Sequence, residues 1–343
     1  HCAIMAESSV PTIDFAPFMN GTEAEKLEVA HQVFSAFKTI GFLILKNHTV
    51  PIDLIERGFD HSKQFFDLPM EQKKESVWET PESNRGFVPP GMEKLSNLDK
   101  DGKGEDIAKL HASLPDAKES FEIGKEPDRF RNMWPKEEYV PGFKDTMLKL
   151  YDEAHNFNVL VMRCIAMALG QSEHALDGYV DKKDNNLRLL HYPGVERAKL
   201  EAGLRRAGEH SDYGSITLLF MRKGMTCSGL QVQEEDGTFL DCPFVENAVI
   251  VNAADLLQRW SNDIIHSTIH RVVQPKEHDT EDGLVPPRYT IVYFCNPNFD
   301  QEVHVLPGCS SEENPPKYPP VNSFDYLVSR LSATYFTEDA KKK

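Results

Sequence analysis

The stretch Glu209-His210-Ser211-Asp212-Tyr213-Gly214-Ser215 lies among short segments in which apolar and polar residues alternate. Alternation with a period of two, interrupted by turn residues, is typical of half-buried β-strands. Segments of this kind are residues 187–192, 215–220, 229–233, 238–240, 249–251, 264–273 and 289–295. Asp236-Gly237 separates two of them and indicates a hairpin. Their spacing predicts an antiparallel sandwich or barrel.

The first half of the chain has a helical pattern instead. Residues 23–39, 51–67 and 142–170 carry apolar residues at helical spacing. In the first of these segments the apolar face consists of Leu27, Ala30, Val33, Phe34 and Phe37. Residues 79–105 are rich in Pro, Gly and polar residues and predict a long loop. We predict an α+β fold with a helical N-terminal region (10–175), a β region (183–310) and a C-terminal helix and tail (311–343).

Composition and charge argue against several classes of protein. The 343 residues include 38 Lys or Arg and 54 Asp or Glu, which gives a formal net charge of −16. Such an acidic chain without a basic stripe is not expected to bind nucleic acid. No apolar run approaches the ~18 residues that a membrane span needs, so we expect no membrane partner. Nothing in the sequence indicates an oligomeric state.

The cysteines indicate a reduced compartment. Six cysteines are spread over the chain, and none forms a Cys-x-x-Cys pair, so neither a thiolate zinc site nor a disulfide scaffold is expected. The N-terminus lacks a basic region followed by an apolar stretch. We expect a cytoplasmic protein with free thiols.

A candidate metal site begins at the opening motif. His210 and Asp212 are two residues apart, so an extended chain presents both side chains on one face. His270 follows 58 residues after Asp212, in the predicted strand over 264–273. Two histidines and one carboxylate are the facial triad of non-haem Fe(II) oxygenases, although Zn²⁺ also accepts imidazole ligands. His266 is an alternative third ligand, because it lies four residues before His270 and shares its face in a strand.

The following β segment carries a candidate anion site. Arg288 and Thr290 share a face, and an Arg can bind a carboxylate through two parallel hydrogen bonds while a hydroxyl adds a third. Arg188 and Tyr192 share a face of an earlier segment. A buried Arg beside a metal requires an anion, which a dicarboxylate co-substrate would supply.

Taken together, these motifs resemble the Fe(II)/2-oxoglutarate-dependent dioxygenases of the isopenicillin N synthase-like group. N-terminal segments that share the resemblance are residues 10–14, 41–48 and 65–69. The resemblance implies a distorted double-stranded β-helix, or jelly roll, with the helical region packed on it. It implies Fe(II) as the metal cofactor, with 2-oxoglutarate and O₂ as co-substrates.

The resemblance also assigns residues to roles. His210, Asp212 and His270 would be the catalytic iron ligands. Arg288, Thr290 and Tyr192 would bind the distal carboxylate of 2-oxoglutarate. The family usually has Ser where this chain has Thr290, which keeps the hydroxyl. Many plant members have Asn where this chain has Leu190, so one polar contact is missing.

Within the family, several segments resemble the fungal thymine dioxygenases: residues 80–87, 118–124, 187–193, 206–210 and 293–297. That resemblance implies a substrate pocket formed by Asn84, Arg188, Tyr213 and Phe294. The related tailoring oxygenases of fungal secondary metabolism act on small oxygenated polyketide rings. The stretches 221–227 and 276–287 differ from the thymine enzymes and favour a tailoring enzyme that hydroxylates or expands a ring to a tropolone. Thymine 7-hydroxylation in pyrimidine salvage is the alternative.

Two functions from other classes compete with this interpretation. A non-catalytic jelly-roll binding module would be missing a member of the triad or of the anion site, and this chain is missing none. A zinc hydrolase would need a general base near the metal and would have no use for Arg288 and Thr290.

Overall fold

The computed structural model describes residues 10–92, 118–201, 206–225, 227–273, 280 and 283–334. The helices are α1 (Ala16–Asn20), α2 (Glu23–Thr39), α3 (Ile52–Phe66), α4 (Met70–Lys74), the 3-10 turn η1 (Pro81–Ser83), α6 (Phe143–Ala168), α7 (Asp177–Val180), α8 (Arg197–Glu201), α9 (Asp255–Trp260) and α10 (Ser323–Thr334). The strands are β1 (Thr12–Asp14), β2 (Phe42–Lys46), β3 (Gly86–Val88), β4 (Glu119–Ile123), β5 (Asn186–Tyr192), β6 (Val195–Glu196), β7 (Ala207–His210), β8 (Ile216–Phe220), β9 (Leu230–Gln233), β10 (Phe239–Asp241), β11 (Ala248–Ala253), β12 (His270–Val272), β13 (Leu284–Val285), β14 (Arg288–Cys295), β15 (Glu302–Val303) and β16 (Val321–Asn322).

Two β-sheets pack face to face and form the centre of the molecule. The larger has the strand order β1-β2-β11-β8-β14-β5-β4-β3, and the smaller β10-β9-β12-β7. Apolar side chains from both fill the space between them; Phe42 and Ile250 of the larger sheet, for example, share a cluster with Leu230 and Val232 of the smaller. Such burial between sheets is the main stabilising term in a sandwich. The predicted α+β jelly roll is confirmed.

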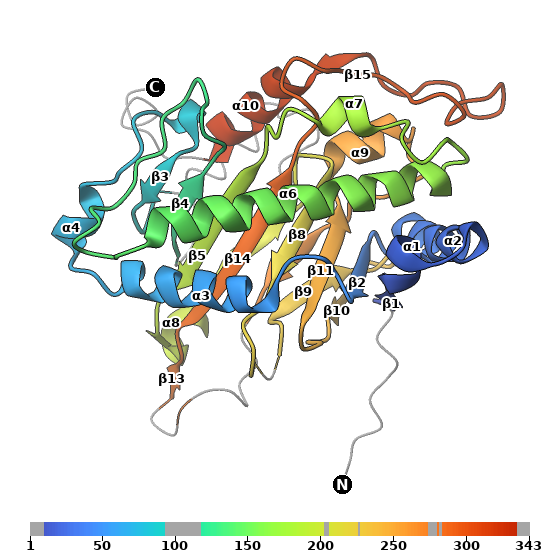
Figure 1. Cartoon of the computed structure of the whole chain (residues 1–343). Helices are drawn as coiled ribbons and strands as arrows, with labels where there is room; N and C mark the ends of the chain where they lie inside the picture. Colours follow the sequence, from blue (N-terminus) through green and yellow to red (C-terminus); the bar gives the residue numbers. More distant parts are fainter. Residues whose placement is uncertain are drawn as a thin grey trace, which may run out of the picture.

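The helices α3 and α6 cover the outer face of the larger sheet (Figure 1). Along α6, Met147, Leu150, Phe157 and Val161 are fully buried, because they recur on the side of the helix that faces the sheet. A capping box begins α2: the Thr22 side chain accepts a hydrogen bond from the backbone amide of Glu25, and the Glu25 side chain accepts one from the backbone amide of Thr22. The predicted start of this helix is therefore confirmed. Within the described residues, no helix has the length and apolar character that a membrane crossing requires.

One face prediction for α2 is wrong at Leu27, which is 41% exposed. The buried stripe of the helix runs through Val29, Val33, Ala36 and Phe37. At about 100° per residue, Leu27 is offset by about a third of a turn from Val33. It therefore lies at the edge of the stripe, and its side chain remains in contact with solvent.

Two segment predictions need correction. The predicted strand over 264–273 is a strand only at β12, His270–Val272. Before it, the amide and hydroxyl of Ser267 bind Gln258 and Asp255 at the α9 turn, so this part of the chain is held by side chains and not by a strand ladder. In the predicted loop over 79–105, Gly86–Val88 pairs with β4, whereas residues 93–105 lie outside the described residues. Part of the 276–287 stretch also lies outside them.

Candidate metal centre

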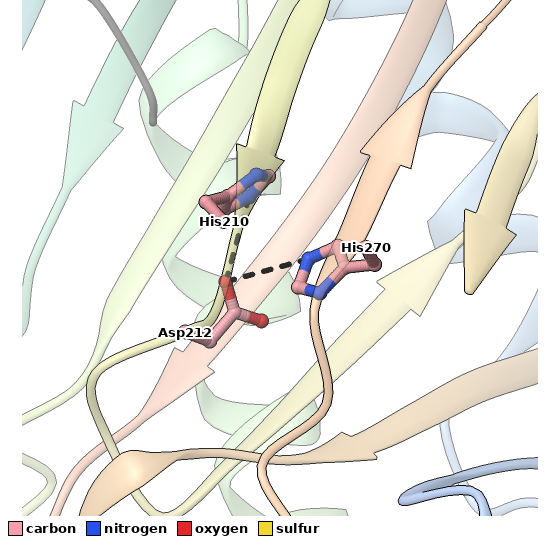
Figure 2. A group of neighbouring side chains, drawn as sticks. All are labelled: His210, Asp212 and His270. Atoms are coloured by element: carbon pink, nitrogen blue, oxygen red, sulfur yellow. Dashed lines mark ion pairs between the residues drawn. The ribbon is translucent and has the colours of Figure 1, made fainter. Parts of the chain in front are cut away.

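Strand register brings the two histidines together. In the smaller sheet, β7 pairs antiparallel with β12, and His210 lies directly opposite His270. Their ring centroids are 4.3 Å apart. Asp212 follows β7 by two residues and turns its carboxylate toward both rings (Figure 2). The three residues offer one ligand atom each, and these atoms lie within 4.8 Å of one another.

The hydrogen bonds of each ring leave the same nitrogen available. His210 Nδ1 donates to the carbonyl of Gly208 at 2.7 Å, and His270 Nδ1 donates to that of Thr268 at 3.1 Å. A carbonyl only accepts, so each ring keeps its proton on Nδ1 and presents a lone pair on Nε2. The Nε2 atoms of His210 and His270 lie 3.9 and 3.7 Å from Asp212 Oδ1. This tautomer and orientation suit metal ligands.

Hydrogen bonds from neighbouring side chains also fix the orientation of the Asp212 carboxylate. Its Oδ2 atom accepts hydrogen bonds from Thr217 Oγ1 at 2.6 Å and from Asn252 Nδ2 at 2.8 Å. Oδ1 is therefore the atom directed at the two imidazoles. Thr217 and Asn252 come from β8 and β11 of the larger sheet, so the site needs both sheets.

Electrostatics favour the protonation states that bind a cation. Burial, and after it the positive charge that His270 carries when protonated, lowers the pKa of His210 to about 3, so this ring is neutral near pH 7. Burial alone would raise the pKa of Asp212. A positive charge on His270 or His210, when either is protonated, and the hydrogen bonds from Thr217 and Asn252 outweigh this and keep the pKa below its usual value. The Nε2 atoms of both imidazoles and one carboxylate oxygen face a common point.

His266, the alternative third ligand, is not in this group. Among the described residues, the cluster contains His270 with His210 and Asp212. The backbone amide of His266 binds the carbonyl of Phe37, in the segment before β12 begins. Only the residue that enters the β7–β12 ladder comes opposite His210.

A cavity joins the metal centre to the predicted anion site. His210, Asp212 and His270 line one part of it, and Tyr192, Arg288 and Thr290 line another. Arg288 and Tyr192 lie opposite each other in the β14–β5 ladder, and Thr290 comes two residues after Arg288 on the same face. The structure therefore places the three predicted residues together.

Several buried polar atoms at this site have no hydrogen-bond partner among the described residues of the protein. Arg288 Nη2 donates to the carbonyl of Ser228 at 2.6 Å, but Nε, Nη1 and the hydroxyl of Thr290 are buried without a hydrogen-bond partner. Burial lowers the pKa of Arg288 from its ordinary value, yet an arginine remains charged. A buried cation without a counter-ion is costly. A carboxylate fits these donors in charge and geometry. Leu190, the departure noted from plant relatives, lies opposite Thr290 and contributes only an apolar wall.

A second cavity opens from the other side of the metal centre. Asn84, Arg188, Tyr213 and Phe294, all predicted to bind substrate, line it together with His210 and Asp212. Arg188 and Phe294 border both cavities, and the guanidinium carbon of Arg188 lies 5.3 Å from the centre of the Phe294 ring. On the outer side, α10 closes this cavity with Leu327 and Leu331.

Several residues at the site were missed by sequence reasoning. Glu122 on β4 lies opposite Arg188 and forms an ion pair with its Nε at 2.7 Å. Asn186 and Asn296 line the second cavity, and Lys118 lines the first. Strand alternation could have found Asn186, because it lies two residues before Arg188 and so shares its face. No sequence signal pairs Glu122 with Arg188.

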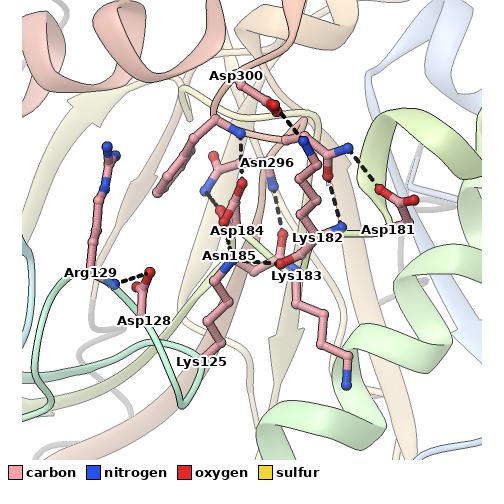
Figure 3. Close-up of polar contacts among 12 residues, drawn as sticks. Lys125, Asp128, Arg129, Asp181, Lys182, Lys183, Asp184, Asn185, Asn296 and Asp300 are labelled. Atoms are coloured by element: carbon pink, nitrogen blue, oxygen red, sulfur yellow. Dashed lines mark hydrogen bonds and ion pairs between the residues drawn. The ribbon is translucent and has the colours of Figure 1, made fainter.

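A polar network supports the far end of the second cavity (Figure 3). Asn185 Oδ1 accepts from the amide of Asn296 at 2.9 Å, and Asn296 Nδ2 donates to the carbonyl of Asp184 at 2.9 Å. The carboxylate of Asp184 accepts from Lys125 Nζ at 2.6 Å. These bonds tie the start of β5 to the end of β14, so the residues that line the cavity there have fixed positions.

Comparison with known proteins supports the fold and the chemistry. Two family models match: the N-terminal region of non-haem dioxygenases of morphine synthesis over residues 10–137, and the 2OG-Fe(II) oxygenase superfamily over residues 183–297. The 2-oxoglutarate-Fe(II) type oxidoreductase ppzD of Metarhizium rileyi is 34% identical over 335 residues, covering 96% of this chain and 92% of the relative. The proline hydroxylase buaE of Petromyces alliaceus is 32% identical over 336 residues, covering 95% and 99%.

A solved structure shares the whole architecture. The thymine 7-hydroxylase of Neurospora crassa, in complex with α-KG and thymine, has a TM-score of 0.84 and 46% sequence identity, covering 94% of this chain and 96% of that one. Its fold is the same double-stranded β-helix with a helical N-terminal region.

Proposed function

This chain belongs to the 2OG-Fe(II) oxygenase superfamily and is a non-haem iron, 2-oxoglutarate-dependent dioxygenase, and on that premise we propose that His210, Asp212 and His270 hold the iron. The support is that the Nε2 atoms of both histidines and Asp212 Oδ1 lie close to one another, while each Nδ1 atom is engaged by a backbone carbonyl. Bound there, Fe(II) would allow O₂ to oxidise both 2-oxoglutarate, to succinate and carbon dioxide, and a C–H bond of the substrate. A zinc enzyme would have no use for the anion site.

The observation that carries this proposal is the set of buried donors at Arg288 and Thr290. We assign them to the distal carboxylate of 2-oxoglutarate, with Tyr192 beside them. The cavity they line continues to the proposed iron ligands, so one bound molecule can reach both. The residues thereby orient the co-substrate and exclude water, which is the usual contribution of a protein to cofactor chemistry.

For the substrate, we propose a small oxygenated ring whose methyl group or adjacent C–H bond is oxidised. The second cavity supports this with aromatic side chains at Phe294 and Tyr213 and with polar groups at Asn84 and Arg188. Our first candidate is a tailoring step of fungal secondary metabolism, either hydroxylation or tropolone-type ring expansion. The names of two fungal relatives, the oxidoreductase ppzD and the proline hydroxylase buaE, do not refer to thymine.

Thymine 7-hydroxylation is the second candidate. It is favoured by the 46% identity to the Neurospora crassa enzyme, whose crystals contain thymine, and by the gathering of all four predicted pocket residues around one cavity.

The test is succinate release from protein loaded anaerobically with Fe(II), after O₂ is admitted in the presence of 2-oxoglutarate and either thymine or a hydroxylated methylcyclohexadienone. Coupling to the dienone with a seven-membered-ring product supports the tailoring enzyme. Coupling to thymine supports the alternative. Succinate without either product keeps the dioxygenase and discards both substrates.

Two histidine variants form a matched pair for the iron assignment. We expect His270→Ala to abolish succinate formation and His266→Ala to retain it, because only His270 meets the other two ligands. Full activity of His270→Ala, or of Asp212→Ala, would contradict the assignment.

A further inference from the structure

Asn186 presents a buried hydrogen-bond acceptor to the second cavity. Its side chain is 4% exposed, and its Oδ1 atom has no hydrogen-bond partner. The other end of the amide is engaged, because Nδ2 donates to the carbonyl of Asn84 at 3.1 Å. That carbonyl can only accept, so the amide cannot rotate by half a turn without losing the bond. The oxygen is therefore fixed at the end of the amide that is away from the Asn84 carbonyl, on a residue that lines the second cavity.

A donor lies beside this acceptor on the same strand face. Arg188 is two residues after Asn186 on β5, and both line the second cavity. Phe294 lies opposite Asn186 in the β14–β5 ladder, and the Arg188 guanidinium stacks near its ring at 5.3 Å. A planar ring against Phe294 would thus have an acceptor and a donor along one edge.

Glu122, on the neighbouring strand β4, compensates the positive charge of Arg188. Glu122 lies opposite it on β4, its carboxylate is fully buried, and Oε1 is 2.7 Å from Arg188 Nε. Ser120 Oγ donates to the same oxygen at 2.7 Å and orients it. A buried carboxylate of this kind keeps its charge only if a cation compensates it. Glu122 thus offsets the positive charge with which Arg188 would otherwise attract an anion.

Among the described residues, the other polar groups that line this cavity are uncharged. Apart from Asp212, which faces the metal centre, and the paired Arg188, the described lining consists of the neutral His210, amides, hydroxyls and apolar side chains, such as those of Asn84, Tyr213 and Leu331. The anion site at Arg288 lies in the other cavity. The two cavities therefore differ in the charge that they accept.

We propose that Asn186 and Glu122 are specificity-determining residues, and that the substrate is an uncharged planar ring bearing an N–H or O–H donor next to a carbonyl. Asn186 Oδ1 accepts from the donor, and Arg188 donates to the carbonyl. Glu122 makes the site reject the corresponding carboxylate. The proposal deepens the proposed function and rests on it, since the ring must lie beside the iron ligands.

Three probes of one shape separate these contributions. 3-Methylbenzamide carries a carbonyl and a donor, 3-methylacetophenone carries the carbonyl alone, and 3-methylbenzoate is the anion. Their dissociation constants are measured by calorimetry on protein loaded anaerobically with Fe(II) and 2-oxoglutarate. We expect the wild-type protein to bind the amide at least tenfold more tightly than either of the others.

Two single substitutions should each change one of these binding preferences. Asn186→Leu should abolish the preference for amide over ketone and leave that for amide over benzoate. Glu122→Gln should increase benzoate affinity at least tenfold relative to the amide. Glu119→Gln is the matched control, because Glu119 is also buried on β4 but binds Lys73 and His191 on the opposite face; its preferences should equal those of the wild type.

Folding is checked by thermal denaturation. If Glu122→Gln does not fold, the double variant Glu122→Gln/Arg188→Gln removes both charges and should show no gain for benzoate. A wild-type protein that prefers the benzoate or the ketone, binds none of the probes, or has preferences that both variants leave unchanged overturns the inference. Failure to bind 2-oxoglutarate at all would instead overturn the proposed function.

Discussion

At the scale of single residues, the two cavities are distinguished by how their arginines are partnered. Arg288 has buried donors left over, whereas Arg188 has a carboxylate at 2.7 Å. We therefore assign the first arginine to an anion and the second to an uncharged group. The difference lies in the neighbour on the adjacent strand and not in the arginine itself.

Replacing Arg288 by Ala should weaken 2-oxoglutarate binding far more than substrate binding. It removes a charge-assisted interaction of roughly 1.5–3 kcal/mol, which corresponds to about 10- to 100-fold in affinity. Calorimetric titration of the anaerobic iron protein with 2-oxoglutarate measures this. Arg222→Ala is the control, since Arg222 forms a surface pair with Asp60. An unchanged affinity in Arg288→Ala would refute the assignment of the anion site.

His155 makes stability depend on pH. It is buried in α6, and its Nδ1 accepts a hydrogen bond from Asn185 Nδ2 at 3.2 Å, which requires the neutral ring. Burial first, and then the nearby charge of Lys183, lowers its pKa from 6.5 to about 4. In this range the unfolded chain binds more protons than the folded one, so stability falls as the pH drops from about 6.5 to 4.

Urea denaturation from pH 7 to 4 measures this effect. The expected contribution of His155 is at most about 1.4 kcal/mol per pH unit. His155→Gln should have a shallower slope by that amount, while His31→Gln, on the exposed side of α2, should keep the wild-type slope. Equal slopes in the wild-type protein and His155→Gln would show that the ring does not titrate in this way.

At the scale of elements, α10 is attached to the metal centre through Asp255. The amide of Asp255 donates to the carbonyl of Asp212 at 2.9 Å, while its carboxylate accepts from Tyr326 of α10 at 3.1 Å. Arg330, one turn further along α10, lies 3.7 Å from the same carboxylate and 4.9 Å from the centre of the Tyr213 ring. Asp255 therefore fixes the position of α10, which closes the second cavity, relative to the proposed iron ligand Asp212.

Loosening this attachment should release α10 without unfolding the sheets. Tyr326→Phe removes one hydrogen bond to a charged acceptor, worth roughly 1.5–3 kcal/mol. Amide hydrogen exchange in α10, measured by mass spectrometry, should therefore increase at least tenfold, while that in β8 and β11 remains unchanged. Asp325→Asn, on the exposed side of α10, is the control. Faster exchange throughout both sheets would mean that Tyr326 supports the whole fold.

At the scale of the whole molecule, the N-terminal region and the jelly roll share one sheet. β2 pairs with β11, and β4 pairs with β5, so strands from the N-terminal region flank the C-terminal ones on both sides. The division into regions 10–175 and 183–310 remains a prediction about sequence. Because the ladder crosses that boundary, we expect both regions to unfold together.

Leu43→Ala tests this cooperativity. Leu43 is fully buried on β2, and its truncation should cost about 2–5 kcal/mol. Fluorescence of Trp134 and of Trp260, each followed in a variant that retains only that tryptophan, should show the same lowered denaturation midpoint. Leu27→Ala, at the exposed leucine of α2, should leave the midpoint unchanged. Separate midpoints for the two tryptophans would contradict a single cooperative unit.

Much of this molecule follows from local patterns in its sequence. Alternation predicted the β segments, helical spacing predicted α2, α3 and α6, and the motifs His210-x-Asp212 and Arg288-x-Thr290 pointed to a metal and an anion. The predictions of strands and helices succeed because side-chain direction repeats every two residues in a strand and about every 3.6 in a helix. Chemistry carried by neighbours along one chain is therefore visible without the fold.

Only the tertiary structure decided which distant residues meet. It selected His270 over His266 because the β7–β12 register places His270 opposite His210. It placed Glu122 behind Arg188 and α10 over the second cavity, although neither contact leaves a periodic signal. The physical reason is that strand register and helix docking are set by the burial of the whole core. A pairing between residues about 60 positions apart therefore depends on contacts that no short stretch of sequence contains.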